Sequence, residues 1–122
     1  MPQYILLIHA PVEGGPSPEE LQAELPRWFE YTEQLRAAGA MVAGEALEPV
    51  ASARTVRVRD GERRVSAGPA EAGPEVLTGY YVIDVADSAA AEDWAARIPS
   101  VPYGSVEIRP IMVFAETAVG AD

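Results

Sequence analysis

Apolar and polar positions divide the chain into short strands and two helical segments. Residues 3–10 (QYILLIHA) are apolar at odd and even positions alike, which is typical of a strand covered on both faces. Residues 17–39 (SPEELQAELPRWFEYTEQLRAAG) predict a helix that Ser17 caps and Gly39 ends. Pro26 should kink or restart this helix, because proline lacks an amide donor and crowds the preceding turn. The predicted core-facing stripe of the helix consists of Leu25, Trp28, Phe29, Thr32 and Leu35.

The rest of the chain predicts a hairpin, a second helix and further strands. Residues 53–66 (ARTVRVRDGERRVS) predict a β-hairpin, because the pair Asp60-Gly61 favours the positive backbone angles of a tight turn. Residues 87–100 (DSAAAEDWAARIPS) predict a short helix with a polar cap at its first or second residue. Additional strands are predicted over residues 41–48, 76–85 and 104–114.

This order of elements predicts an α+β fold. The expected architecture is a ferredoxin-like antiparallel sheet with two helices on one face and one extra strand near its middle. Residues 1–114 form the single predicted domain, and residues 115–122 form a C-terminal tail. The helices cover only one face of such a sheet, yet the first and last strands are apolar on both sides. We therefore expect a homodimer whose two sheets pack face to face.

Composition removes several kinds of chemistry. The chain has no cysteine, all nine basic residues are arginine, and His9 is the single histidine. These counts exclude a thiol nucleophile, a lysine Schiff base, a cysteine-ligated metal and a histidine cluster within one subunit. The composition does not exclude a metal site formed by carboxylates from both subunits of a dimer, although no motif encodes one. We expect no metal and no cofactor, which leaves acid–base chemistry or simple binding of a small molecule.

Charge and hydropathy narrow the partners and the compartment. The net charge of −10 argues against nucleic acid and anionic membranes as partners. No apolar run reaches the roughly 18 residues needed to cross a bilayer. The chain opens directly on a strand without a basic region, so we expect no signal peptide. Together with the absence of cysteine, this pattern predicts a cytoplasmic protein.

Five separated stretches of the chain together resemble a known family. They are YILLIH, WFEYTEQLRAAGAMVAGEALEP, ARTVRVRDGERRVSAGP, VLTGYYVIDVADSAAAEDWAARIPS and GSVEIRP. In this order and spacing they look like the YCII-related proteins, specifically the DGPF branch, over roughly residues 3–110. The resemblance implies a ferredoxin-like dimer of the dimeric α/β-barrel type. Most members of the family have no established reaction.

The same resemblance gives a meaning to the loop that follows the predicted hairpin. At this place the family carries the pattern Asp-Gly-Pro-Phe-Ala-Glu-Thr-Lys-Glu. In this chain Gly68 and Pro69 match the pattern and Glu75 occupies its final position, whereas Ala67 stands in place of the aspartate. The resemblance implies that the loop shapes a ligand pocket. Members of the broader family were proposed to use a histidine–aspartate pair, and His9 corresponds to that histidine.

The charged candidates lie on the first and last predicted strands. His9 ends the first strand, a common place for site residues in open sheets, and a histidine side chain is suited to proton transfer at neutral pH. The alternative is a strand-end histidine that bonds only to backbone or solvent. Glu107 and Arg109 share one face of the last strand with Ser105. This pair either binds a carboxylate or phenolate, or forms a structural salt bridge at a dimer seam.

The aromatic candidates divide between a cavity and the core. Tyr80 and Tyr81 point to opposite faces of their strand, so one can line a cavity while the other packs beneath a helix. Trp28 and Trp94 are interpreted as helix-packing residues. Five arginines of the hairpin form either a solvated or a subunit-facing strand pair; they are Arg54, Arg57, Arg59, Arg63 and Arg64.

These observations lead to two main functional hypotheses. The first is a cofactor-independent enzyme, of the isomerase, dehydratase, cyclase or lyase type, that transfers protons on a hydrophobic, oxygenated small molecule. His9 would move the proton, Arg109 would hold developing negative charge, and a tyrosine together with residues 67–75 would shape the pocket. The second is a non-catalytic, small-molecule-binding or regulatory dimer that keeps the pocket without the loop aspartate. A third hypothesis is a purely structural interaction protein, but it does not explain the loop at residues 67–75.

Overall fold

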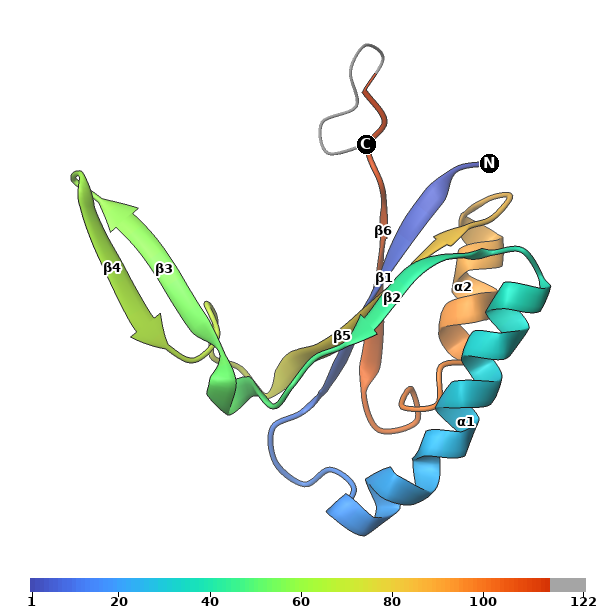
Figure 1. Cartoon of the computed structure of the whole chain (residues 1–122), viewed down its shortest axis with the longest axis horizontal. Coiled ribbons are helices and arrows are strands. Elements are labelled where there is room, and N and C mark those ends of the chain that lie inside the picture. Colours follow the sequence, from blue (N-terminus) through green and yellow to red (C-terminus); the bar gives the residue numbers. More distant parts are fainter. Residues whose placement is uncertain (115–122) are drawn as a thin grey trace.

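The computed structural model describes residues 1–114, which form one four-stranded sheet, two α-helices and a separate hairpin (Figure 1). In chain order the elements are β1 (Gln3–Pro11), α1 (Pro18–Ala37), β2 (Met41–Ala46), the 3-10 turn η1 (Val50–Ser52), β3 (Arg54–Arg59), β4 (Glu62–Ala67), β5 (Glu75–Asp84), α2 (Ser88–Ala96) and β6 (Ser105–Pro110). The predicted C-terminal tail, residues 115–122, lies outside the described residues.

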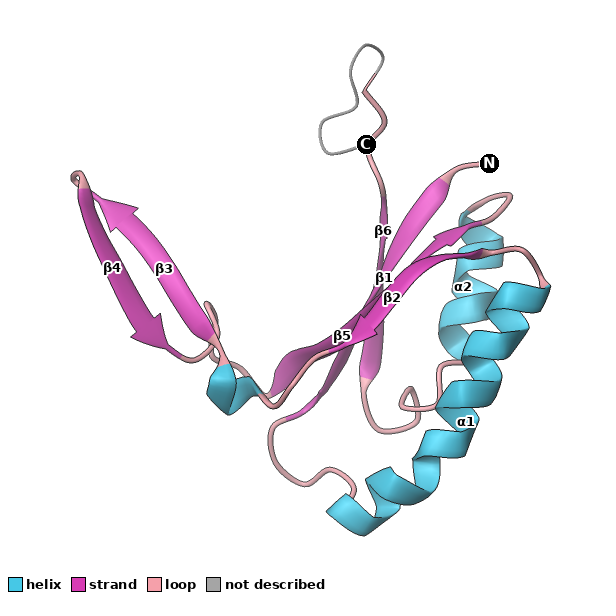
Figure 2. Ribbon diagram, viewed as in Figure 1, coloured by secondary structure: helices cyan, strands magenta, loops and turns pink. Residues whose placement is uncertain are grey.

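The main sheet is antiparallel throughout, in the order β2-β5-β1-β6. Both helices lie on one of its faces (Figure 2), so the protein has the predicted ferredoxin-like α+β fold. The apolar first strand is central, as its sequence indicates: Leu6 pairs with Tyr81 on β5 and with Ile108 on β6. The other face of the sheet carries no element of the described chain in contact with its centre, and we call it the open face.

Capping explains where α1 begins and ends. Ser17 and Glu20 form a capping box, in which each side chain accepts a hydrogen bond from the backbone amide of the other residue. Gly39 follows the last turn with φ 72°, a conformation that favours glycine. Pro26 lies inside the helix without dividing it, so the helix does not restart there. Neither helix of the described residues is long and apolar enough to cross a membrane.

The predicted core-facing stripe of α1 was partly wrong. Leu35 is fully buried as predicted, and Trp28 and Thr32 are partly buried. The helix also buries Glu24 and Tyr31, which were not predicted, whereas Phe29 is 69% exposed and Leu25 is 39% exposed. The buried positions begin one residue earlier than predicted, because a carboxylate was not counted as a core residue. Tyr31 contributes to this orientation, since its hydroxyl donates a 2.8 Å hydrogen bond to the carbonyl of Trp94 on α2.

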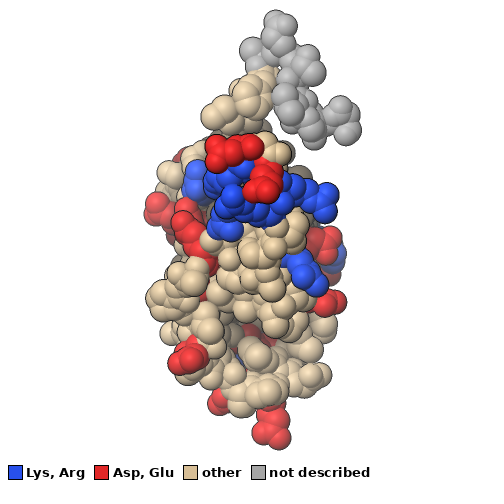
Figure 3. All heavy atoms as spheres, turned by 90° about the vertical axis from the view of Figure 1, so that its left-hand side faces the viewer, with Lys and Arg blue, Asp and Glu red and all other residues tan. Residues whose placement is uncertain are grey.

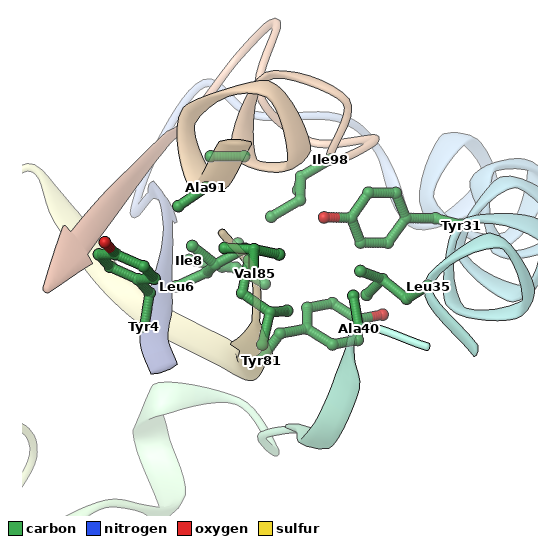
Figure 4. Packing of buried hydrophobic residues seen from close by; sticks show 12 residues of the cluster. Tyr4, Leu6, Ile8, Tyr31, Leu35, Ala40, Tyr81, Val85, Ala91 and Ile98 are labelled. Atoms are coloured by element: carbon green, nitrogen blue, oxygen red, sulfur yellow. The ribbon is translucent and has the colours of Figure 1, made fainter. Parts of the chain in front are cut away.

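The hydrophobic core lies between the helices and the even-numbered residues of β1 (Figure 4). Its fully buried side chains are those of Leu6, Leu35, Ile83 and Ile98. Each such side chain contributes about 1.5–3 kcal/mol through the removal of apolar surface from water. Trp28 and Trp94 are partly buried against this cluster, which confirms that they are helix-packing residues.

The strands β3 and β4 form the predicted hairpin, with Asp60 at φ 54° and Gly61 at φ 76° in its turn. The expectation that the hairpin adds a strand to the main sheet was wrong, because β3 and β4 form a two-stranded sheet of their own. Arginines occur on both faces of this hairpin, for example Arg57 on one and Arg63 on the other. Placing either face beneath the helices would remove cations from water at a high cost.

Candidate functional site

A cavity of about 640 Å³ lies between α1 and the helix-covered face of the sheet. We call it the helix-face cavity. It exists because the side chains at the N-terminal end of α1 do not fill the space above β1, β5 and β2. Its walls are mostly apolar and include Ile8, Leu25, Trp28, Phe29, Met41 and Tyr81. One set of polar groups, Glu24, Ser100 and Tyr103, lies where α1 approaches the segment between α2 and β6, and we call it the polar end of the cavity. Other polar residues of the lining come from α1, β2 and β5, and they include Thr32, Arg36, Glu45 and Thr78.

Glu24 is the buried carboxylate of this polar end, and it is only 6% exposed. Its Oε1 accepts hydrogen bonds from Trp28 Nε1 at 2.9 Å and from the Tyr103 hydroxyl at 2.8 Å. Its Oε2 also lies 3.0 Å from the same hydroxyl. No arginine of residues 1–114 forms an ion pair with this carboxylate. A carboxylate can accept about four hydrogen bonds, so Glu24 still has acceptor capacity for a ligand that offers donors.

Tyr103 is held against Glu24 by the turn that precedes β6. The amides of Tyr103 and Gly104 both donate to the carbonyl of Ser100. Gly104 is required here, because a Cβ on this residue would lie 2.3 Å from the carbonyl oxygen of His9. Burial, the hydrogen bond to Glu24 and the charge of Glu24 all raise the pKa of Tyr103, while the nearby Arg27 lowers it. The phenol therefore stays protonated and acts as a donor.

Ser100 adds an unused polar group to the same end of the cavity. The residue is only 4% exposed, and its hydroxyl has no hydrogen-bond partner within residues 1–114. A buried hydroxyl without a partner is rare and costs roughly 1–3 kcal/mol. A ligand that bonds this hydroxyl would remove that cost.

A second hydroxyl pair lies farther along the cavity. Thr32 Oγ1 and the Tyr81 hydroxyl are 2.7 Å apart, and they connect α1 to β5. Gly44 on β2 gives the ring of Tyr81 its space, because a Cβ there would lie 2.6 Å from Tyr81 Cδ1. Of the two tyrosines predicted as ligand contacts, Tyr81 points to the helix side. Tyr80 borders the cavity too, although strand alternation directs its side chain to the open face.

His9 lies on the open face rather than in the helix-face cavity. It is partly buried beside an irregularity in the β1–β5 pairing, and it is directly opposite Ser105 on β6. The hydroxyl of Ser105 donates a 2.7 Å hydrogen bond to Glu75 Oε1, and this bond spans β1 near His9. The structure thus brings His9 and Glu75 to the same end of the open face.

Arg109 and Glu107 are farther along this face. Their side chains are 3.5 Å apart and more than half exposed. Arg109 pairs with Ile5, four positions along β1 from His9, a separation of about 13 Å at 3.3 Å per residue. One chain therefore does not bring His9 and Arg109 together.

The loop after the hairpin is anchored to the hairpin base. Gly68 has φ 97°, its amide donates to the carbonyl of Ala53, and its carbonyl accepts from Thr55 Oγ1 at 2.8 Å. None of residues 67–75, including Pro69, lines the helix-face cavity.

Sequence reasoning missed Glu24, Ser100 and Tyr103. One signal was available for Glu24, because it lies four residues before Trp28 and seven before Tyr31, on the side of α1 that is otherwise apolar. Ser100 and Tyr103 lie in a turn whose partners are distant in the sequence, and nothing in their local pattern marks them. Within residues 1–114, no group of three or more histidine, cysteine or carboxylate side chains is placed to hold a metal ion.

The antiparallel sheet with its two helices and the cavity beneath α1 define a small ferredoxin-like α+β protein with room for a ligand. The model of the YCII-related domain matches residues 3–115, and the chain belongs to this family. A comparison with curated proteins gives no match. Membership in this family does not specify a reaction, so the function is argued from the site.

Proposed function

We propose that the protein binds a hydrophobic small molecule with a neutral hydroxyl head group in the helix-face cavity. The observation that carries this proposal is the pairing of two polar groups at one end of an apolar cavity. One is the buried Glu24 carboxylate, which has hydrogen bonds but no ion-pair partner within residues 1–114. The other is the Ser100 hydroxyl, which has no partner in the same range.

The size and lining of the cavity support a ligand of this class. A volume of about 640 Å³ lies within the range of 300–1,000 Å³ that is typical of small-molecule sites. The apolar wall would hold a ring or chain, and the head group would donate to Glu24 and bond Ser100. An anionic head group would be repelled by the buried carboxylate, which gives the site a preference among otherwise similar ligands.

A matched set of ligands tests this preference: naphthol, naphthalene and naphthoate share one apolar body. We expect naphthol to bind most tightly and naphthoate most weakly, measured by calorimetry and by the fluorescence of Trp28 in the cavity wall. Glu24→Gln removes the charge at nearly constant volume and should reduce the discrimination against naphthoate by about tenfold. Glu30→Gln, an exposed residue of the same helix, is the control. Equal binding of all three molecules, unchanged in Glu24→Gln, would overturn the proposal.

A second candidate function is proton-transfer catalysis on such a molecule. At the cavity, Glu24 would accept the proton, and the Tyr103 hydroxyl, released from Glu24 as that carboxylate is protonated, would donate its hydrogen bond to a developing oxyanion. The alternative assignment uses His9 on the open face, and it is supported by the nearby Ser105–Glu75 hydrogen bond. It requires a second subunit to close the pocket. Once a reaction is found, His9→Ala and Glu24→Gln distinguish the two sites, since only the variant at the reacting site should lower turnover by about 10²-fold or more.

The proposed assembly is a homodimer that packs through the open face. Its support is the row of partly buried apolar side chains there, which includes Ile5, Leu7 and Val82. We also propose membership in the DGPF branch, supported by Gly68 and Pro69. A cytoplasmic location is proposed on the absence of cysteine.

A further inference from the structure

The hairpin β3–β4 extends from the body of the protein as an arm. Figure 1 shows it beyond the end of β2 and β5, leaning to the side of the sheet opposite the helices. Its strands pair only with each other. An isolated two-stranded hairpin is marginally stable in water, so an arm of this kind is expected to gain stability from a surface that it packs on.

The two faces of the arm differ in chemistry. The pairing of Val56 with Val65 and of Val58 with Arg63 places all three valines on one face. All three valines are exposed: Val56 by 60%, Val58 by 59% and Val65 by 50%. The opposite face carries Thr55, Arg57, Arg59, Glu62, Arg64 and Ser66. The valine face also carries Arg54 and Arg63, one toward each end of the hairpin, whereas the opposite face has no apolar side chain. The apolar surface of the arm therefore lies on one face only, with cations beside it.

The charge of the arm is opposite to that of the rest of the chain. Five of the nine arginines lie in residues 54–64, together with only two of the nineteen carboxylates. The whole chain nevertheless has a net charge of −10. Figure 3 shows the basic side chains gathered on the side of the molecule where the arm projects. The arm is therefore complementary to the acidic body of its own chain type.

We propose that the arm packs on a second copy of this chain, with its valine face against the copy that covers the open face. The arm and the sheet form a V that opens on the open-face side (Figure 1), so a copy seated on the sheet lies beside the arm. Charge complementarity favours a copy of the same acidic chain over an anionic polymer, which the body would repel. By two-fold symmetry, each subunit would hold the other with its arm.

The experiment combines sedimentation with hydrogen exchange over a range of protein concentrations. We expect a dimer at micromolar concentration, in which the amides of residues 54–67 are protected. On dilution to monomer, these amides should exchange much faster while those of β1 and β5 remain protected. A monomer at every concentration, or an arm that is equally protected in the monomer, would overturn the proposal.

Matched substitutions separate the arm from the open face. Val58→Asp adds a charge to the valine face and should weaken dimerisation by about tenfold or more, because the carboxylate would be buried against the partner. Ser66→Asp adds the same charge to the other face of the arm and should change dimerisation by less than about twofold. Both positions are exposed, so the fold should persist, as circular dichroism would verify. If Leu7→Asp abolishes the dimer while Val58→Asp has no effect, the open face is the interface and the arm proposal is wrong.

Discussion

The two faces of the main sheet have similar apolar residues but different surroundings. On the helix side, Leu6 is fully buried, with α1 and α2 packed over the sheet. Its neighbour Leu7 points to the open face and is only partly buried. The helix side in turn contains a buried carboxylate, Glu24, whereas Arg109, the one arginine of the main sheet, lies exposed on the open face.

This difference shows that apolar sequence and burial are separate properties. Both faces of β1 are apolar in sequence, yet the helices of the chain are enough to cover only one of them. The stability of a single subunit is therefore concentrated on the helix side. An apolar face without a cover indicates an interaction surface.

The largest expected effect compares the two leucines directly. Leu6→Ala should lower the free energy of unfolding by about 2–5 kcal/mol, because it leaves a cavity in the core. Leu7→Ala should cost less than half of this amount in dilute solution. Urea denaturation at several protein concentrations measures both. An equal cost at the lowest concentration would show that the open face is buried within a single subunit.

The next effect concerns the buried carboxylate. Glu24→Ala leaves the Trp28 indole and the Tyr103 hydroxyl without their acceptor, and should destabilise the protein by about 1–3 kcal/mol. Glu30→Ala, on the exposed side of the same helix, should change the stability by no more than about 0.5 kcal/mol. Identical unfolding curves for the two variants would contradict the role of Glu24 as the hydrogen-bond acceptor at the polar end of the cavity.

A smaller effect is expected at the hydroxyl pair that joins α1 to β5. Thr32→Val keeps the shape of the side chain and removes its hydrogen bond to Tyr81, at a cost of about 1 kcal/mol. Thr55→Val on the arm serves as a comparison, since its hydroxyl bonds only the loop carbonyl of Gly68. Thermal unfolding should show a lower midpoint for Thr32→Val than for Thr55→Val.

The last effect is a loss of stability at alkaline pH, and it arises from two tyrosines on the helix side of the sheet. Burial raises the pKa of Tyr31 and of Tyr103 above the usual value of about 10. Above pH 10 the unfolded chain loses these protons before the folded chain does, so the free energy of unfolding should fall as the pH rises. Tyr31→Phe and Tyr103→Phe should each reduce this fall. A stability that is flat to pH 11 would contradict the burial of Tyr31.

Local patterns predicted the elements well, because their causes are local. The helix α1 begins at a capping box and the hairpin turns at Asp60-Gly61, and both signals involve residues within four positions of each other. Local patterns could not predict whether the hairpin pairs with the main sheet. Whether β3 and β4 join the main sheet depends on the cost of covering their arginines, which is a property of the whole fold.

The candidate site was less predictable for the same reason. His9 was singled out as the only histidine, at the end of a strand, but the sequence did not indicate which face of the sheet it would lie on. The polar end of the cavity depends on contacts between Glu24 and Tyr103, which are 79 residues apart. No spacing rule connects two such positions. Only the packing of α1 against the turn before β6 brings them together.

The central position of β1 also has a consequence for synthesis of the chain. This strand is made first, but its partners are residues 75–84 and 105–110. At roughly 5–20 residues per second on the ribosome, β1 waits several seconds for β5 and longer for β6. During this time an apolar segment has no strand to pair with and is open to chaperones or to aggregation. Folding of the sheet is therefore tied to translation through residue 110, and pauses before that point would prolong the exposure of β1.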